Sequence, residues 1–167
     1  MSKRPLMGFT LVELMVTIAV LATILAFAVP SMQLTMANSR MSSVANELAS
    51  DLKKVRSEAV VGRRNYSFKP NASVWNNQGW YAISESNPSG PVLLKKESFS
   101  NKVVITEASS NYNIVFSGTT GMTNAVADVK FKICDTSLNN ELGYYVLLNR
   151  FGRVLIQRHA TSTDCAS

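Results

Sequence analysis

The first sixty residues carry two successive hydrophobic patterns. From Phe9 to Val29 the chain is apolar and contains a single charged side chain, Glu13. At a rise of about 1.5 Å per residue, a helix of this length can cross a hydrocarbon layer of about 30 Å. We therefore predict a transmembrane or assembly helix over 9–30.

Beyond Pro30 the pattern becomes amphipathic. Apolar residues recur every three or four positions, which indicates one buried face of a helix: Met41, Val44, Leu48, Leu52, Val55 and Ala59. Pro30 removes one backbone hydrogen bond and is expected to kink the helix without ending it. Gly62 is typical of a helix stop. The pattern predicts one helix from about Phe9 to Val61, with an amphipathic second half over 31–62.

After Gly62 the pattern changes to short strands separated by turns rich in Gly, Asn, Ser and Pro. In 126–134, apolar and charged residues alternate as in a strand with one buried and one solvated face. The predicted strands are 65–68, 80–84, 92–96, 103–107, 112–116, 126–134, 144–148 and 154–157. We expect an α+β fold, in which one long helix packs on an antiparallel β-rich head over 63–167.

Charge adds a weak indication about partners. The formal net charge is +6, from 17 basic and 11 acidic residues. A basic exterior favours anionic partners such as nucleic acid or lipid headgroups. An ordinary soluble basic surface explains the same numbers, so charge alone does not identify a partner.

The sequence contains little that suggests catalysis. His159 is the single histidine, and no serine lies in a nucleophile elbow. The Gly-x-x-Gly over 118–121 is typical of a turn rather than of a phosphate-binding loop. We expect no enzymatic activity, no cofactor and no metal site.

The N-terminus admits three interpretations. Lys3 and Arg4 before an apolar run suit a membrane anchor with its positive end in the cytoplasm. They also suit a cleavable secretory signal, although the apolar run exceeds the usual length of about 7–15 residues. Neither interpretation explains Glu13, because an unpaired carboxylate within a membrane span costs several kcal/mol.

The third interpretation comes from the segment Gly8-Phe9-Thr10-Leu11-Val12-Glu13-Leu14. It resembles the cleavage site of type IV prepilins. The resemblance implies that 1–8 is a leader, that a prepilin peptidase cuts after Gly8, and that the new N-terminal Phe9 is methylated. It also implies an assembly role for Glu13, whose carboxylate would lie near the terminal amine of a neighbouring subunit. Opposite charges in a dry bundle attract strongly, and either one alone is penalised.

Over its whole length the chain resembles the FimT/FimU/GspH group of minor pilins and pseudopilins, through Arg-Ser-Glu-Ala-Val over 56–60 and Gly-Arg-Val over 152–154. The resemblance implies other major and minor pilins as partners. It also implies a single-pass protein of the inner membrane of a Gram-negative bacterium, with its head in the periplasm before it enters an extracellular pilus. We expect a minor pilin of the initiation or tip complex. The alternatives are a DNA-binding minor pilin for natural transformation and a GspH-like pseudopilin of type II secretion.

Arg150, Arg153 and Arg158 are the candidate DNA-binding residues. Gly152 suggests a tight hairpin turn, and arginines at a hairpin tip can grip phosphates. The alternative is solubilising charge at an exposed strand edge. FimT-type members are associated with DNA capture through Gly-Arg-x-Arg, and Leu155 stands here where that motif has its second arginine.

The two cysteines, Cys134 and Cys165, permit one intramolecular pairing, which suits a domain outside the cytosol. A disulfide between them would tie the C-terminal tail to a strand of the head. It would close a loop of about 30 residues and contribute about 3 kcal/mol.

Overall fold

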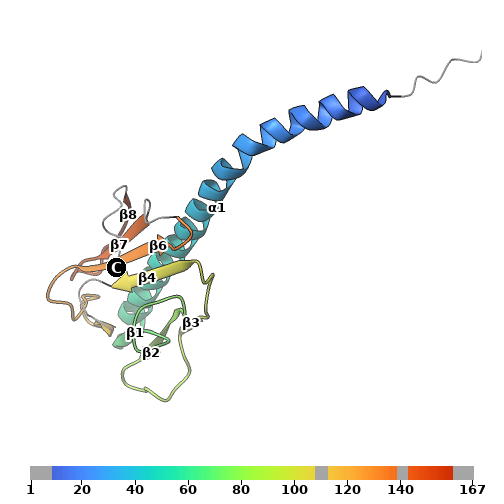
Figure 1. Ribbon diagram of the computed structural model, residues 1–167. Coiled ribbons are helices and arrows are strands. Elements are labelled where there is room, and N and C mark those ends of the chain that lie inside the picture. The colour runs from blue at the N-terminus through green and yellow to red at the C-terminus, as the bar shows by residue number, and fades with distance from the viewer. Residues whose placement is uncertain (1–8, 108–112, 139–142, 160–167) are drawn as a thin grey trace, which may run out of the picture. The chain divides into compact units, whose positions relative to one another are not determined.

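The computed structural model describes residues 9–107, 113–138 and 143–159 (Figure 1). Within these ranges one helix, α1 (Leu11–Gly62), precedes eight strands. The strands are β1 (Tyr66–Pro70), β2 (Trp80–Ser84), β3 (Leu94–Lys96), β4 (Val103–Glu107), β5 (Ile114–Phe116), β6 (Val129–Asp135), β7 (Gly143–Leu148) and β8 (Val154–His159). The chain divides into two compact units, Met1–Met36 and Ala37–Ser167.

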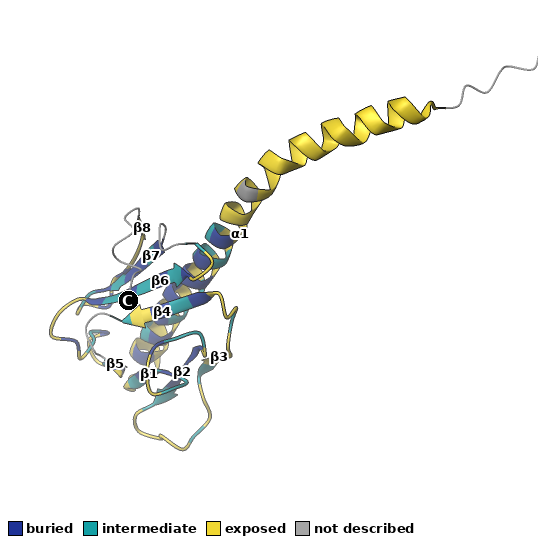
Figure 2. Cartoon of the chain, viewed as in Figure 1, coloured by how far each residue is buried: buried dark blue, intermediate teal, exposed yellow. Residues whose placement is uncertain are grey.

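In the first unit, α1 is apolar and exposed over 11–29. Figure 2 shows this stretch in the colour of exposed residues, and α1 contains a segment long and apolar enough to cross a membrane. The Thr17 hydroxyl donates to the Leu14 carbonyl at 2.8 Å, and the Thr23 hydroxyl donates to the Val20 carbonyl at 2.7 Å. These threonines therefore satisfy their donors within the helix, and Glu13 is the one acidic or basic residue of the apolar stretch.

In the second unit, α1 buries the predicted face. All six residues of the predicted apolar stripe are buried, together with Ala37, Ala45 and Ala49. Most of them join one core with large side chains from both sheets, among them Phe68, Trp80 and Phe131. Full burial of one large apolar side chain stabilises the fold by about 1.5–3 kcal/mol. The head is therefore assembled on the amphipathic half of α1.

The strands form two antiparallel four-stranded sheets (Figure 1). The first sheet has the order β3-β2-β1-β5, and the second has the order β4-β6-β7-β8. The architecture is thus α+β, with one long helix packed on antiparallel sheets, as the sequence predicts. Each predicted strand overlaps an observed strand.

β6 shows the expected alternation but begins later than predicted. Val129, Phe131 and Ile133 are buried, while Lys130 and Lys132 are half-buried on the other face. The ladder with β7 starts at the pair of Val129 and Leu148, and residues before Val129 have no partner in it. Val126, which the pattern placed inside the strand, is therefore 94 % exposed.

Candidate functional site

Thr10 caps the N-terminus of α1. The Glu13 backbone N–H donates to the Thr10 hydroxyl at 3.2 Å, and the Leu14 N–H donates to the Thr10 carbonyl at 3.2 Å. Thr10 and Glu13 have the spacing of a capping box, which identifies Thr10 as the helix cap. Sequence reasoning from charge alone missed this role of Thr10. Glu13 also lies in the first turn, where the helix dipole favours a negative charge. The cap therefore fixes the place of Glu13, which is four residues after Phe9.

The processing site itself is only half described. Phe9 is 82 % exposed and precedes the first turn of α1. Gly8 lies outside the described residues. Cleavage after Gly8 and methylation of Phe9 therefore stay predictions.

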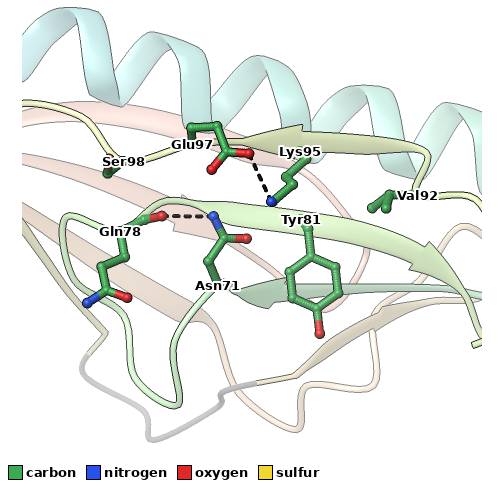
Figure 3. A pocket seen from close by; sticks show the side chains of 7 residues that line it. All are labelled: Asn71, Gln78, Tyr81, Val92, Lys95, Glu97 and Ser98. Carbon is green, nitrogen blue, oxygen red and sulfur yellow. Dashed lines mark hydrogen bonds and ion pairs between the residues drawn. The ribbon is translucent and has the colours of Figure 1, made fainter. Parts of the chain in front are cut away.

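A hollow lies on the first sheet and the loops that flank it (Figure 3). Its volume is about 560 Å³, and it is lined by Asn71, Gln78, Tyr81, Val92, Lys95, Glu97 and Ser98. The Lys95 Nζ lies 2.8 Å from the Glu97 carboxylate. The Asn71 amide donates to the carbonyls of Gln78 and Lys96, at 2.8 and 2.7 Å. The Asn71 bonds brace the loop between β1 and β2. The side chains that line the hollow form no nucleophile–base pair.

The residues that the structure describes offer no candidate metal site. They include no cluster of three or more His, Cys, Asp or Glu side chains that could hold an ion. Cys134 lies half-buried on β6. Its expected partner, Cys165, lies outside the described residues, so this disulfide stays a prediction.

The expected hairpin between β7 and β8 is present, and its turn is tightly bonded. The Gly152 N–H donates to the Asn149 carbonyl at 2.9 Å, and the Arg153 N–H donates to the Asn149 side-chain oxygen at 2.9 Å. Gly152 has a φ of +76°, which glycine adopts without strain. Arg150 and Arg153 are both exposed on this turn.

Two further segments hold the turn in place. The Thr123 N–H donates to the Arg150 carbonyl at 2.8 Å. The Arg56 Nε of α1 donates to the Gly121 carbonyl at 3.1 Å. A Cβ on Gly152 would stand 2.5 Å from that Nε and 2.6 Å from the Gly121 carbonyl oxygen. The end of α1, the loop 117–124 and the β7–β8 turn therefore meet at one point.

The structure gathers two of the three candidate arginines. Arg158 follows Arg153 by five positions along β8, a separation of about 17 Å at about 3.3 Å per residue. Arg56 is the arginine that packs against the turn instead. Sequence reasoning missed it because its contact with Gly121 joins residues 65 positions apart.

Gly152→Ala should lower the free energy of unfolding of the head by about 2 kcal/mol, since the new side chain combines a strained φ with a clash. Thermal unfolding of fragment 31–167, which contains every residue of the core cluster, measures the effect. Adding Arg56→Ala should restore only part of the loss, because the Gly121 carbonyl and the φ remain. An unchanged melting temperature for Gly152→Ala would contradict this geometry.

An ion pair with a buried carboxylate joins α1 to the end of β6. The Arg40 Nε and Nη2 donate to one Asp135 carboxylate oxygen at 3.0 and 2.9 Å. The Ser137 N–H donates to the other oxygen at 2.9 Å, and the Ser137 hydroxyl also bonds to it. Burial acts to raise the pKa of Asp135, but the hydrogen bonds from Ser137 and Arg40 outweigh it and hold the pKa below 3.8.

A second polar contact joins α1 to the first sheet. The Trp80 indole N–H donates to the Asp51 carboxylate at 2.7 Å, and one turn earlier Glu47 pairs with Lys96 at 2.6 Å. Burial raises the pKa of Asp51 above its ordinary value of 3.8, although the bond from Trp80 opposes this.

Asp51→Asn should therefore make the head more stable relative to the native chain as pH rises from about 4 to 7. A carboxyl whose folded pKa is raised stabilises the fold below its unfolded pKa and loses that contribution as pH rises through the folded pKa. Asparagine keeps an acceptor for Trp80 and does not ionise. Denaturant unfolding at several pH values measures the difference, and parallel stability curves for the two proteins would contradict the prediction.

Comparison with known proteins gives a consistent result. Residues 44–152 match the family model described as Type II transport protein GspH. Two crystal forms of the type IV minor pilin FimU of Pseudomonas aeruginosa have TM-scores of 0.61 and 0.58 at 24 % identity. They cover 72 and 70 % of this chain and 90 and 91 % of FimU.

The minor pseudopilin EpsH from the type 2 secretion system of Vibrio cholerae has a TM-score of 0.51 at 7 % identity. The match covers 72 % of this chain and 97 % of EpsH. No curated protein matches the chain in sequence. At these identities the solved structures establish a common fold, while the family model covers more than half of the chain.

Proposed function

The chain belongs to the family of the Type II transport protein GspH, and we propose that within this family it is a minor pilin of the initiation or tip complex of a type IV pilus. It acts as a structural subunit and is processed by a prepilin peptidase after Gly8. Its partners are other pilins, and the inner membrane holds it before assembly.

One observation carries this proposal. α1 begins with an exposed apolar segment, 11–29, and its later residues from Met41 to Ala59 belong to the core of the head. An apolar helix surface of this length needs a membrane or a bundle of like helices to cover it. A filament subunit meets both surroundings in turn, first the bilayer and then the filament.

The similarity of the head to FimU supports the pilus rather than the secretion pseudopilus. FimU matches with a TM-score of 0.61, against 0.51 for EpsH. A pseudopilin of type II secretion is the alternative, in keeping with the description of the family model.

Deletion of the chain tests this choice. We expect surface pili to disappear and protein secretion to continue, with pili restored by the native chain and not by Gly8→Val, which should keep its leader. Loss of secretion with normal pili would instead make the chain a pseudopilin. The mass of the purified chain reports in the same cells whether the leader was removed.

DNA uptake is the second candidate function, favoured by the exposure of Arg150 and Arg153 on a braced turn. Neither guanidinium forms an ion pair within the described part of the chain. Binding that releases counterions should weaken steeply with salt, with a log–log slope of about −0.9 per phosphate contacted. Fragment 31–167 should then lose salt-sensitive DNA binding in Arg150→Ala/Arg153→Ala and keep it in Arg158→Ala. Equal binding by all three proteins would leave these arginines as surface charge.

A further inference from the structure

The end of α1 and the β7–β8 turn together present a patch that neither sequence segment reveals alone. We call it the basic end patch, and it consists of Arg56, Val60, Val61, Arg63, Arg64, Arg150, Phe151 and Arg153. The loop 117–124 brings its two parts together. A Cβ on Gly121 would stand 2.9 Å from Val60 Cγ2, and one on Gly118 would meet the backbone of Arg63 and Arg64.

The patch is strongly and unevenly charged. Segments 56–64 and 149–154 contain its five arginines and only one acidic residue, Glu58. None of the five guanidinium groups forms an ion pair with a carboxylate within the described ranges. Two other cations of the head are paired, Arg40 with Asp135 and Lys96 with Glu47. The patch thus keeps a positive potential that attracts an acidic surface.

The same patch exposes apolar area. Val61 is 79 % exposed, Phe151 60 % and Val60 44 %. The Arg150 guanidinium lies 5.7 Å from the centre of the Phe151 ring, within the range of a cation–π contact. A hollow of about 320 Å³ adjoins Val60 and Val61, beside Lys53 and Arg56. Aromatic and arginine side chains around a small recess are the composition of protein–protein hot spots.

We propose that the basic end patch docks an acidic surface on the head of another filament subunit, with Phe151 and Val61 as apolar anchors. This inference rests on the proposed function, because it names the partner of a pilin. The phosphates of DNA would bind the arginines but would make no favourable contact with Val60 and Val61. The exposed apolar side chains therefore favour a protein partner over DNA. A second copy docked through the same patch would place like charges opposite each other, at a cost of several kcal/mol.

The patch is a rigid template for such docking. Asn149 and Thr123 hold the turn by hydrogen bonds at 2.8–2.9 Å, and Arg56 holds the adjoining loop through the Gly121 carbonyl at 3.1 Å. Side chains on a braced turn lose less conformational entropy on binding than those on a free loop. The arginines at its rim provide attraction at a distance, and the apolar residues provide contact after water leaves.

Site-specific photo-crosslinking of the full-length chain in its own cells tests the inference. A photo-reactive amino acid replaces Val61 or Phe151, with Val74 as an exposed control position on the same head. Leu14 and Ile18 serve as positions in the apolar segment, where adducts with other pilins report on the proposed function alone. Mass spectrometry identifies the partner and the segment joined to it.

We expect adducts from Val61 and Phe151 with an acidic segment of an identified pilin. They should fall by at least about tenfold in Arg150→Glu/Arg153→Glu, since like charges across an interface cost more than the 1.4 kcal/mol that corresponds to tenfold. The matched control, Lys102→Glu/Arg158→Glu, changes the net charge equally and should keep them. The docking inference would be overturned if Val61 and Phe151 gave adducts only with DNA, or if their adducts were insensitive to the charge reversal. It would also be overturned if neither position gave an adduct while the Leu14 and Ile18 adducts persisted. Loss of the Leu14 and Ile18 adducts would overturn the proposed function and the inference with it.

Discussion

Arg40→Ala is expected to lower the free energy of unfolding of the head by about 3 kcal/mol, because it leaves a buried charge without its cation. Asp135 has no exposed side-chain area, whereas the Arg40 side chain is 30 % exposed. Removing the arginine therefore leaves a buried carboxylate without its cation. Denaturant unfolding of fragment 31–167 at neutral pH measures the change.

The double variant Arg40→Ala/Asp135→Asn is the control for this prediction. It removes the stranded charge as well, so it should recover part of the stability lost in Arg40→Ala. The native pair should also weaken in acid: the pKa of Asp135 is lowered in the folded state, so its contribution is present above the unfolded pKa and lost as pH falls through the folded pKa. A loss for Arg40→Ala that stays constant down to about pH 2 would contradict this account.

Glu13→Ala should be processed normally and yet fall by more than about tenfold in sheared filaments relative to the membrane fraction. In a dry bundle of helices, the carboxylate and the terminal amine of a neighbouring subunit stabilise each other, and the amine alone is left with a cost of several kcal/mol. Quantitative immunoblots of the filament and membrane fractions give the ratio.

Two controls separate charge from capping at this site. Glu13→Gln keeps the length and hydrogen-bonding groups of the side chain and should fail as Glu13→Ala does. Thr10→Ser keeps the hydroxyl that accepts from the Glu13 N–H at 3.2 Å and should assemble normally. Native incorporation of Glu13→Gln would show that the carboxylate charge is not needed for assembly.

Elements set by local pattern could be predicted from the sequence. The stripe from Met41 to Ala59 has helical spacing, and every member of it is buried in the head. Trp80–Ser84 and Val103–Glu107 occupy the predicted positions, since each alternates between faces and ends at turn residues. The hairpin around Gly152 was also predictable, because a glycine between two strand patterns marks a turn.

Contacts between distant residues could not be predicted in this way. Arg40 and Asp135 are 95 positions apart, and neither carries a local signal that names the other. The packing of Arg56 against Gly121 and Gly152 depends on how the loop 117–124 crosses the end of α1. For the same reason three nearby arginines in the sequence did not form one site, because the extended β8 carries Arg158 away from the turn.

The most direct test of the central proposal is mass spectrometry of the chain recovered from sheared surface filaments. We expect a mature chain that starts at an N-methylated Phe9, found in the filament fraction together with other pilins. A chain absent from filaments, or one present with residues 1–8 attached, would contradict the assignment as a processed filament subunit.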